Sequence, residues 1–397
     1  MKTIYKRVIA VLILCVVVIT VAHFMQGNAW YEPKETVPDT EDTLKEAPKD
    51  DVVETADLIF WYEDESYRTF LEQAVKSYKE ETGKVVELQY IDTLDYLDAV
   101  YDATMAEGNY PDVYLLSGEE LEEAYLYGLA AINTSRDAYE TSASKNAVNA
   151  SVYQNEMYGY PLSYNTCLFV YLNGYFETAP TSIQEIITYS NENEPPENVE
   201  FLMEWDVNDA FYNFPFVSNG VKFSQSETSV VEITYNETLY QSDLAFLQEM
   251  LESFSVDANT VSEEKIISNL QEKKTLCAIL DSDSLAQLNE EEYSIMEMPK
   301  LSDSLQSASC GLTDLVMVND FSKNQETAEE FAKFVTLTMS EQLHALSGHY
   351  SVVLSDNANA TEQIAYNAYE NSILAPCTQD ARDFWVKLKE TIAVYFD

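Results

Sequence analysis

Aromatic and polar side chains lie together at the ends of several predicted strands of this chain. Trp61 follows the first predicted strand, and Glu63 and Asp64 come next to it. An aromatic ring can cover the apolar face of a sugar ring, and carboxylates accept hydrogen bonds from its hydroxyl groups. Each residue alone fits ordinary packing equally well, so the shared position is what indicates a ligand site. The candidates at strand ends are Trp61, Glu63, Asp64, Ser117, Glu119, Trp205, Asp209 and Asp281, and the candidates Tyr164 and Asn165 lie within the run Gly159–Tyr171.

Motifs for other chemistry are absent from the sequence. It contains no Gly-x-x-x-x-Gly-Lys phosphate loop and no Gly-x-Ser-x-Gly nucleophile turn. Of its three histidines, His344 and His349 are spaced so that they do not share a helical face, which argues against a metal site. We therefore expect a protein that is not an enzyme and needs neither cofactor nor metal. A secreted glycosidase stays open as an alternative, because carboxylate pairs are abundant.

The first half of the body alternates between strand and helix patterns. Gly83 and Gly128 stand where helices end, in the position that favours a left-handed residue. This order predicts a parallel sheet covered on both faces, with ligands at the carboxyl ends of its strands. The predicted elements are a strand over Asp57–Trp61, a helix from Tyr67 to Gly83, a strand over Lys84–Tyr90, a helix capped by Asp92 and ended by Gly108, a strand over Pro111–Leu116, and a short helix over Glu119–Leu126.

A second alternating region begins near Tyr164. It contains a predicted strand over Glu200–Met203 and helices around 208–217, 242–254 and 262–271. Residues 275–318 are rich in strand patterns, and the tail from Thr327 is mostly helical.

The first residues of the chain predict export. Lys2, Lys6 and Arg7 precede the apolar run Val8–Ala22, and the acidic, proline-containing stretch 31–56 predicts a disordered tether. Residues 1–30 are either a retained membrane anchor or a signal peptide cleaved near Gly27-Asn28-Ala29. Leu14 argues against lipidation of Cys15, because that modification requires a small residue before the cysteine. We expect an extracytoplasmic protein at the cell surface, either tethered to the membrane or secreted.

Composition narrows the class further. The formal net charge of −47 argues against nucleic-acid partners, which require a basic surface. The four cysteines of the body have no paired spacing, so a zinc site or a dense set of disulfides is not indicated. A body of this length predicts two domains.

Four segments in order resemble a known family. They are Leu58–Trp61 with Thr82–Val86, Glu107–Tyr114 with Tyr127–Leu129, Tyr158–Asn165, and Ala328–Val335. Together they are similar to the extracellular solute-binding proteins of ABC importers, in the sugar-binding branch that includes the maltose-binding proteins. The resemblance covers residues 57 to about 355.

That resemblance implies an α/β, two-lobed fold of the type II periplasmic binding proteins, with mixed sheets flanked by helices and a hinge between the lobes. The first lobe would comprise 57–163 plus about 281–318, and the second 164–280 plus about 319–397. The chain would cross near Leu162–Asn165, Leu280 and Val316–Asp320. The pocket segment of the second lobe would be Asp209–Phe211, and Tyr350 would be the aromatic residue near the last crossing.

The implied function is binding without chemistry. A monomer would capture a small solute, with carbohydrate favoured, close around it and deliver it to ABC permease subunits. Leu116 stands where maltose binders carry a stacking tryptophan, and Glu119-Glu120 replaces an acid followed by a base. These departures argue against a maltodextrin, and a polyamine or another cationic solute is the alternative ligand.

Overall fold

The structure is a computed structural model that describes residues 55–106, 108–225, 231–289 and 291–396. The predicted N-terminal span and all of the predicted tether up to residue 54 lie outside these residues. Within the described part of the chain, no helix is both long enough and apolar enough to cross a membrane.

Three parallel strands begin the body, as the alternating pattern predicts. β1 (Leu58–Tyr62) pairs with β2 (Val86–Tyr90) on one side and β3 (Val113–Ser117) on the other. Helix α2 (Arg68–Thr82) ends at Gly83, whose φ of 75° is left-handed. The predicted cap Asp92 is wrong, because α3 (Tyr96–Met105) begins later and has Asp95 at its N-cap position.

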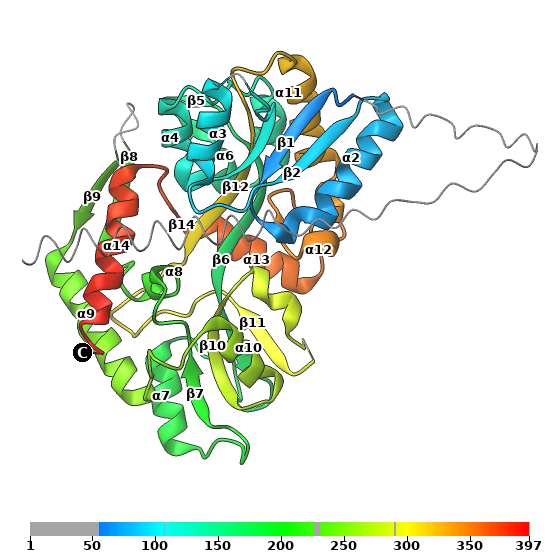
Figure 1. The fold of residues 1–397 in the computed structure, drawn as a ribbon. Coiled ribbons are helices and arrows are strands. Elements are labelled where there is room, and N and C mark those ends of the chain that lie inside the picture. Colours follow the sequence, from blue (N-terminus) through cyan, green and yellow to red (C-terminus); the bar gives the residue numbers. More distant parts are fainter. Residues whose placement is uncertain (1–54, 107, 226–230, 290, 397) are drawn as a thin grey trace, which may run out of the picture. The chain divides into compact units, whose positions relative to one another are not determined.

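One long strand, β6 (Tyr160–Leu172), joins the two halves of the main sheet (Figure 1). Its first half pairs antiparallel with β12 (Cys310–Val318), from Tyr160 opposite Val316 to Thr166 opposite Gly311. Its second half pairs with β10 (Thr275–Asp281) and with β11 (Tyr293–Met296). The strand order is β2-β1-β3-β12-β6-β10-β7, with β7 spanning Phe201–Glu204. The partner of β6 therefore changes at residues 166–167.

The remaining elements surround this sheet. The helices are α4 (Leu121–Leu126), α5 (Arg136–Ser142), α6 (Lys145–Ala150), α7 (Ile183–Glu192), α8 (Ala210–Asn213), α9 (Glu237–Phe254), α10 (Glu263–Gln271), α11 (Gln325–Lys333), α12 (Ser340–Ser347), α13 (Ala360–Glu370) and α14 (Gln379–Ala393). Short helical turns are η1 (Glu65–Tyr67), η2 (Gly118–Glu120), η3 (Phe214–Phe216), η4 (Asp283–Gln287) and η5 (Phe334–Thr338). The small strand pairs are β4 (Val152–Tyr153) with β5 (Glu156–Met157) and β8 (Val221–Gln225) with β9 (Val231–Tyr235); β13 (Tyr350–Ser351) pairs with β6, and β14 (Ile373–Leu374) with β12.

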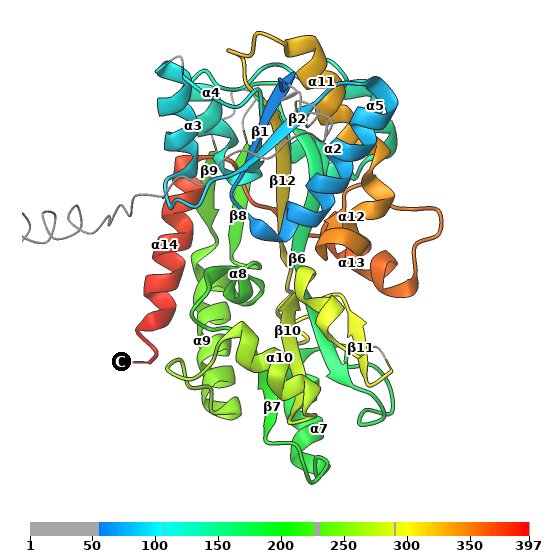
Figure 2. The same cartoon turned by 45° about the vertical axis from the view of Figure 1, so that its right-hand side comes forward.

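Two groups of buried side chains define two lobes. The first lobe packs around β1, β3 and α2, with Phe60, Phe70 and Phe331 in its core. The second packs around β7, β10 and α9, with Trp205 and Leu247 in its core. Helix α14, at the end of the chain, lies along β9 and α8 of the second lobe (Figure 2).

The predicted lobe boundaries differ from this packing at two places. Residues 281–309 are predicted in the first lobe, yet β11 pairs with the second-lobe half of β6. Residues 319–397 are predicted in the second lobe, yet α11, η5 and α12 bury Phe331, Val335 and Leu343 in the first-lobe core. A periodic helix pattern specifies the apolar face of the helix but not which sheet covers that face. The sequence therefore assigns these two segments to the other lobe.

Candidate functional site

A cavity of about 420 Å³ lies where the partner of β6 changes, and it is lined from both lobes. Leu312 and Asn165, which pair across β12 and β6, reach it from the sheet, and Asp281 reaches it from the end of β10. The switch point between strands is the usual ligand position in such sheets, and the volume is within the range of roughly 300–1,000 Å³ for small-molecule sites. The lining residues are Glu119, Asn165, Asp209, Ala210, Phe211, Tyr212, Glu263, Asp281, Leu312 and Trp385.

Asp209 positions one wall of the cavity. It is the N-cap of α8, and its Oδ1 accepts a hydrogen bond from the Phe211 amide at 2.9 Å. The short helix turns Phe211 and Tyr212 toward the cavity. The indole N–H of Trp205 donates to Asn213 Oδ1 at 3.0 Å and so fixes the C-terminal end of α8.

A hydrogen-bonded carboxylate pair forms a second wall. Asp281 Oδ2 accepts from Asn165 Nδ2 at 2.9 Å, and Asp281 Oδ1 accepts from the Ser284 amide at 2.8 Å. Glu263 begins α10 and accepts a hydrogen bond from the Ser284 hydroxyl. Burial raises the pKa of Glu263, and the neighbouring Asp281 charge raises it further. The Asp281 charge and burial therefore both favour the protonated form of Glu263.

Glu119 and Trp385 face each other across the remaining side. Glu119 lies in η2 directly after β3, and burial raises its pKa to about 6. The charge of Glu120 adds to that rise, while the Trp385 indole and Arg382 oppose it. The indole Nε1 of Trp385 is buried yet lies outside regular hydrogen-bond geometry with any described atom. The indole N–H therefore lies beside the Glu119 carboxyl group at the edge of the cavity.

The electrostatic character of the cavity is acidic. Four of the ten described lining residues are carboxylates, and none of the ten is basic. Burial raises the pKa of the Cys167 thiol behind the cavity, and Asp281, Asp209 and Glu263 add to the rise. Among the described residues, no group of three or more metal-binding side chains converges on one point.

Five of the predicted site residues line this cavity. They are Glu119, Asn165, Asp209, Phe211 and Asp281. Ser117 stands next to it, where its hydroxyl oxygen accepts from the Glu119 amide at 3.4 Å and supports the turn.

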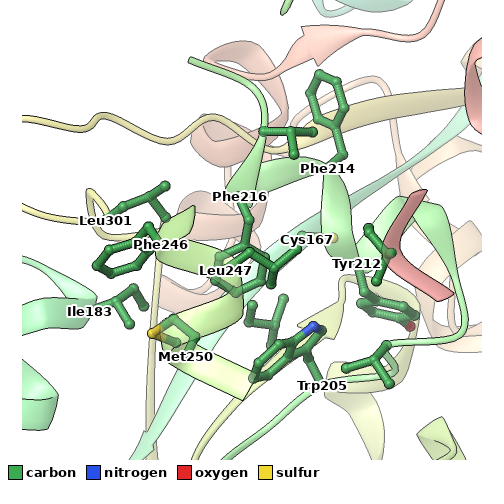
Figure 3. Close-up of a cluster of buried hydrophobic side chains, with 14 of the residues drawn as sticks. Cys167, Ile183, Trp205, Tyr212, Phe214, Phe216, Phe246, Leu247, Met250 and Leu301 are labelled. Carbon is green, nitrogen blue, oxygen red and sulfur yellow. The ribbon is translucent and has the colours of Figure 1, made fainter. Parts of the chain in front are cut away.

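The two tryptophans predicted at the site lie in the cores of the lobes and do not line the cavity. Trp61 is 7 % exposed and packs with Val100 and Leu116 on the face of β1 opposite to Phe60. Trp205 is fully buried, and Figure 3 shows it among Met250, Leu247 and Tyr212. Both faces of these strands are covered by helices, so a large apolar ring near a strand end turns into the core.

The two predicted tyrosines are also buried in a core. Tyr164 stacks on Tyr369 of α13, with ring centroids 4.5 Å apart. Tyr350 pairs with Tyr164 across β13 and β6 and stacks on His344 at 4.2 Å. They belong to the cluster between α13 and β6 and do not line the cavity.

Asp64 belongs to a second polar group, and Glu63 lies near that group. We call it the His349 cluster, and its members are His349, Asp64, Ser66, Tyr67, Ser163, Asp283 and Asp314. In it, His349 Nδ1 lies 2.9 Å from Asp283 Oδ2, and His349 Nε2 lies 2.6 Å from Ser66 Oγ. The Tyr67 hydroxyl donates to Asp314 Oδ2 at 2.5 Å. Burial raises the pKa of Glu63 to about 7, with the charges of Glu120, Asp64 and Asp314 adding to the rise. Neither Glu63 nor Asp64 lines the cavity.

Four lining residues were not predicted from the sequence, namely Tyr212, Glu263, Leu312 and Trp385, while Ala210 lies within the predicted pocket segment Asp209–Phe211. Glu263 carried a signal, since it follows the capping residue Ser262 at a helix start. No sequence signal identified Trp385, because Phe384-Trp385 is typical of the apolar side of a helix.

Comparisons with known proteins agree with this architecture. The family model for bacterial extracellular solute-binding proteins matches residues 73–371. A maltooligosaccharide ABC transporter solute-binding lipoprotein of Streptococcus pneumoniae serotype 4 is 23 % identical over 305 residues, which cover 71 % of this chain and 69 % of that protein. Its counterpart from Streptococcus pneumoniae strain R6 gives the same values.

Solved structures share the fold. A cyclo/maltodextrin-binding protein complexed with maltotetraose gives a TM-score of 0.73 at 16 % identity, covering 87 % of this chain and 93 % of that one. An extracellular solute-binding protein from Staphylococcus aureus with maltose gives 0.69 at 17 % identity, covering 85 % and 92 %. The Thermus thermophilus maltotriose-binding protein gives 0.69 at 14 % identity, covering 85 % and 94 %. The predicted type II periplasmic-binding-protein fold is thereby confirmed.

Proposed function

Because this chain belongs to the family of bacterial extracellular solute-binding proteins, we propose that the cavity between its lobes captures a carbohydrate for an ABC import system. The observation that carries the proposal is the composition of the cavity. Trp385, Phe211 and Tyr212 supply aromatic faces, while Asn165 and four carboxylates supply polar rims from both lobes. That combination matches a sugar, which has apolar ring faces and hydroxyl edges.

The mechanism is capture by closure. A ligand that contacts Glu119 on the first lobe and Asp209 or Glu263 on the second gains more in a closed state than in an open one, and so shifts the population toward closure. β6 and β12 connect the lobes and are the segments about which such a movement would turn. A permease that distinguishes the closed state then receives the loaded protein. The family is one of binding proteins, so no reaction is assigned to the carboxylates.

Location follows in two steps. The family is extracellular, which places this body outside the cytoplasm. Attachment is our proposal: the apolar run Val8–Ala22 or lipidation at Cys15 would hold the body at the membrane, since the Streptococcus relatives are named lipoproteins. Membrane pelleting of the full chain, and its loss or persistence in Cys15→Ser, separates the two forms of attachment. Release of a protein beginning near Trp30 into the medium would contradict both.

Thermal unfolding of the full chain with a panel of saccharides tests the capture function. Neutral glucose oligomers are included because the curated relatives are named for maltooligosaccharides. A ligand at 100 times its Kd should raise the free energy of unfolding by about 2.7 kcal/mol. Small-angle scattering should show a more compact body with that ligand. Stabilisation without compaction would contradict capture by closure.

A further inference from the structure

We propose that the ligand of the cavity carries at least one protonated amino group, so that an amino sugar or a short oligomer of amino sugars is its chemical class. The inference rests on the proposed function of the cavity as a carbohydrate site. It goes beyond that function by assigning a charge to the ligand. The relatives named above bind neutral glucose oligomers, as their printed names say, so this chain would differ from them.

The first observation is that the charge of the cavity has no counterpart in its wall. Glu119, Asp209, Glu263 and Asp281 line it, and none of the described lining residues is basic. The guanidinium of Arg382, which does not line the cavity, lies 2.8 Å from Glu123 Oε2, and its charge also lowers the pKa of Glu119. Even with Glu263 protonated, three further carboxyl groups of the wall have no basic residue beside them in the described lining.

The second observation is that the hydrogen bonds to these carboxylates come from neutral donors and do not neutralise their charges. Asp281 accepts from Asn165 and Ser284, and Asp209 accepts from the Phe211 amide, but every one of these donors is neutral. A neutral ligand would therefore close the cavity over carboxylates without an opposite charge, which is costly in a dry site. An ammonium group supplies the missing charge and donates strong, charge-assisted hydrogen bonds.

The third observation separates an organic cation from a metal ion. No three metal-binding side chains of the described residues converge on one point. Instead, the carboxylates are spread around Trp385, Phe211 and Tyr212. The buried Trp385 Nε1–H lies beside the Glu119 carboxyl group and lowers its pKa, and it places a neutral donor next to the ligand space. A ring with both hydroxyl and ammonium groups uses all of these features together.

The sign of the pH dependence distinguishes the two kinds of ligand. Burial raises the pKa of Glu119 to about 6; Glu120 and Asp314 add to the rise, and Trp385 and Arg382 oppose it. Burial and Asp281 raise the pKa of Glu263, against hydrogen bonds from Ser284 and Tyr212. A bound ammonium lowers both values, so binding releases protons and affinity increases from pH 5 to 6.5. A neutral ligand dehydrates the carboxylates further, so binding takes up protons and affinity decreases.

Isothermal titration of the full chain in detergent tests the inference with four probes. They are triglucosamine, its fully N-acetylated form, maltotriose and spermidine. We expect triglucosamine to bind at least about 10-fold more tightly than either neutral trisaccharide, as the loss of one charged hydrogen bond predicts. Titration in two buffers of different ionisation enthalpy should show proton release.

Charge-removing variants locate the recognition. Glu263→Gln and Asp209→Asn should each weaken triglucosamine binding about 10- to 100-fold. Asn at position 209 can still cap α8, so that variant should fold even if Glu263→Gln does not. Glu264→Gln is the matched control, because Glu264 is the exposed neighbour of Glu263 on α10 and does not line the cavity. Its affinity should equal that of the unmodified chain.

Each other result decides against the inference. If maltotriose binds as tightly as triglucosamine, the charge assignment fails while the proposed carbohydrate function holds. If spermidine binds more tightly than triglucosamine, the ligand is a linear amine and the amino-sugar class is wrong. If Glu264→Gln weakens binding as much as Glu263→Gln, the effect is a general one of surface charge. Absence of binding by all four probes overturns both the inference and the carbohydrate function.

Discussion

Two groups of carboxylates lie near β6, and they differ in the side chains that surround them. In the His349 cluster, Asp283 contacts an imidazole and Asp314 accepts from Tyr67 and from Ser163 at 2.9 Å. The Tyr67 ring also stacks on His349 at 4.1 Å. In the cavity, the carboxylates have neutral donors only, and no described lining residue is basic. We therefore expect the His349 cluster to contribute to the stability of the fold, and the cavity carboxylates to be available to a ligand.

Disrupting the His349 cluster should have the largest effect on stability. His349→Ala removes the partner of buried Asp283 and the ring beneath Tyr67, so we expect the free energy of unfolding to fall by about 2–4 kcal/mol. Urea unfolding at pH 6 measures it. The pair His349→Gln with Asp283→Asn keeps a hydrogen bond without charge and should recover most of the loss. If His349→Ala were as stable as the unmodified chain, the His349 cluster would not be a stabilising group, and its contrast with the cavity carboxylates would fail.

The unfolding free energy should also decrease as the pH rises from about 4.5 to 7. Glu119 and Glu63 have pKa values raised to about 6 and about 7, both chiefly by burial, so the folded chain binds more protons than the unfolded chain in this window. Glu119 alone accounts for roughly 2 kcal/mol at 1.4 kcal/mol per pKa unit. Denaturant titrations at pH 5 and 7.5 check the sign.

A variant separates the contribution of the cavity from that of the rest of the chain. Glu119→Gln should flatten the lower part of this pH profile, because it removes the group that titrates near 6. A profile that rises with pH would contradict the assigned burial of these carboxyl groups.

A smaller effect is expected from the aromatic side of the cavity. Trp385→Ala removes a ring face, and the affinity for the sugar ligand should fall about 2- to 10-fold, as stacking energies predict. Trp385→Phe keeps a ring and should retain most of the affinity while losing the indole donor. Titration calorimetry on both variants separates stacking from hydrogen bonding. Equal, unchanged affinities would exclude Trp385 from the site.

The smallest effect is the stability change on neutralising a cavity carboxylate. Glu263→Gln removes repulsion from Asp281 and keeps an acceptor for the Ser284 hydroxyl, so the unfolding free energy should stay within about 0.5 kcal/mol or increase slightly. This result, opposite to that for His349→Ala, would sharpen the comparison of the two groups. Destabilisation by several kcal/mol would show that the Glu263–Asp281 pair is structural.

Part of the lining of the candidate cavity could be predicted from the sequence because local rules govern it. Strand ends after β1, β3 and β10 follow from buried runs that stop at polar residues, and the carboxyl ends of strands are where such sheets bind ligands. Gly83 and Gly128 adopt φ of 75° and 72° at helix ends, as their positions predict. Glu119 and Asp281 therefore line the cavity from the ends of β3 and β10, whereas Asn165 lines it from within β6.

What the tertiary structure alone decided is which rings face the ligand. Trp61 and Trp205 stand near the predicted strand ends, yet helices cover both sheet faces and turn these rings into the cores. Trp385 reaches the cavity only because α14 returns from the end of the chain to lie along α8 and β9. Periodicity records which side of an element is apolar, whereas the surface that this side meets depends on contacts between residues far apart in sequence.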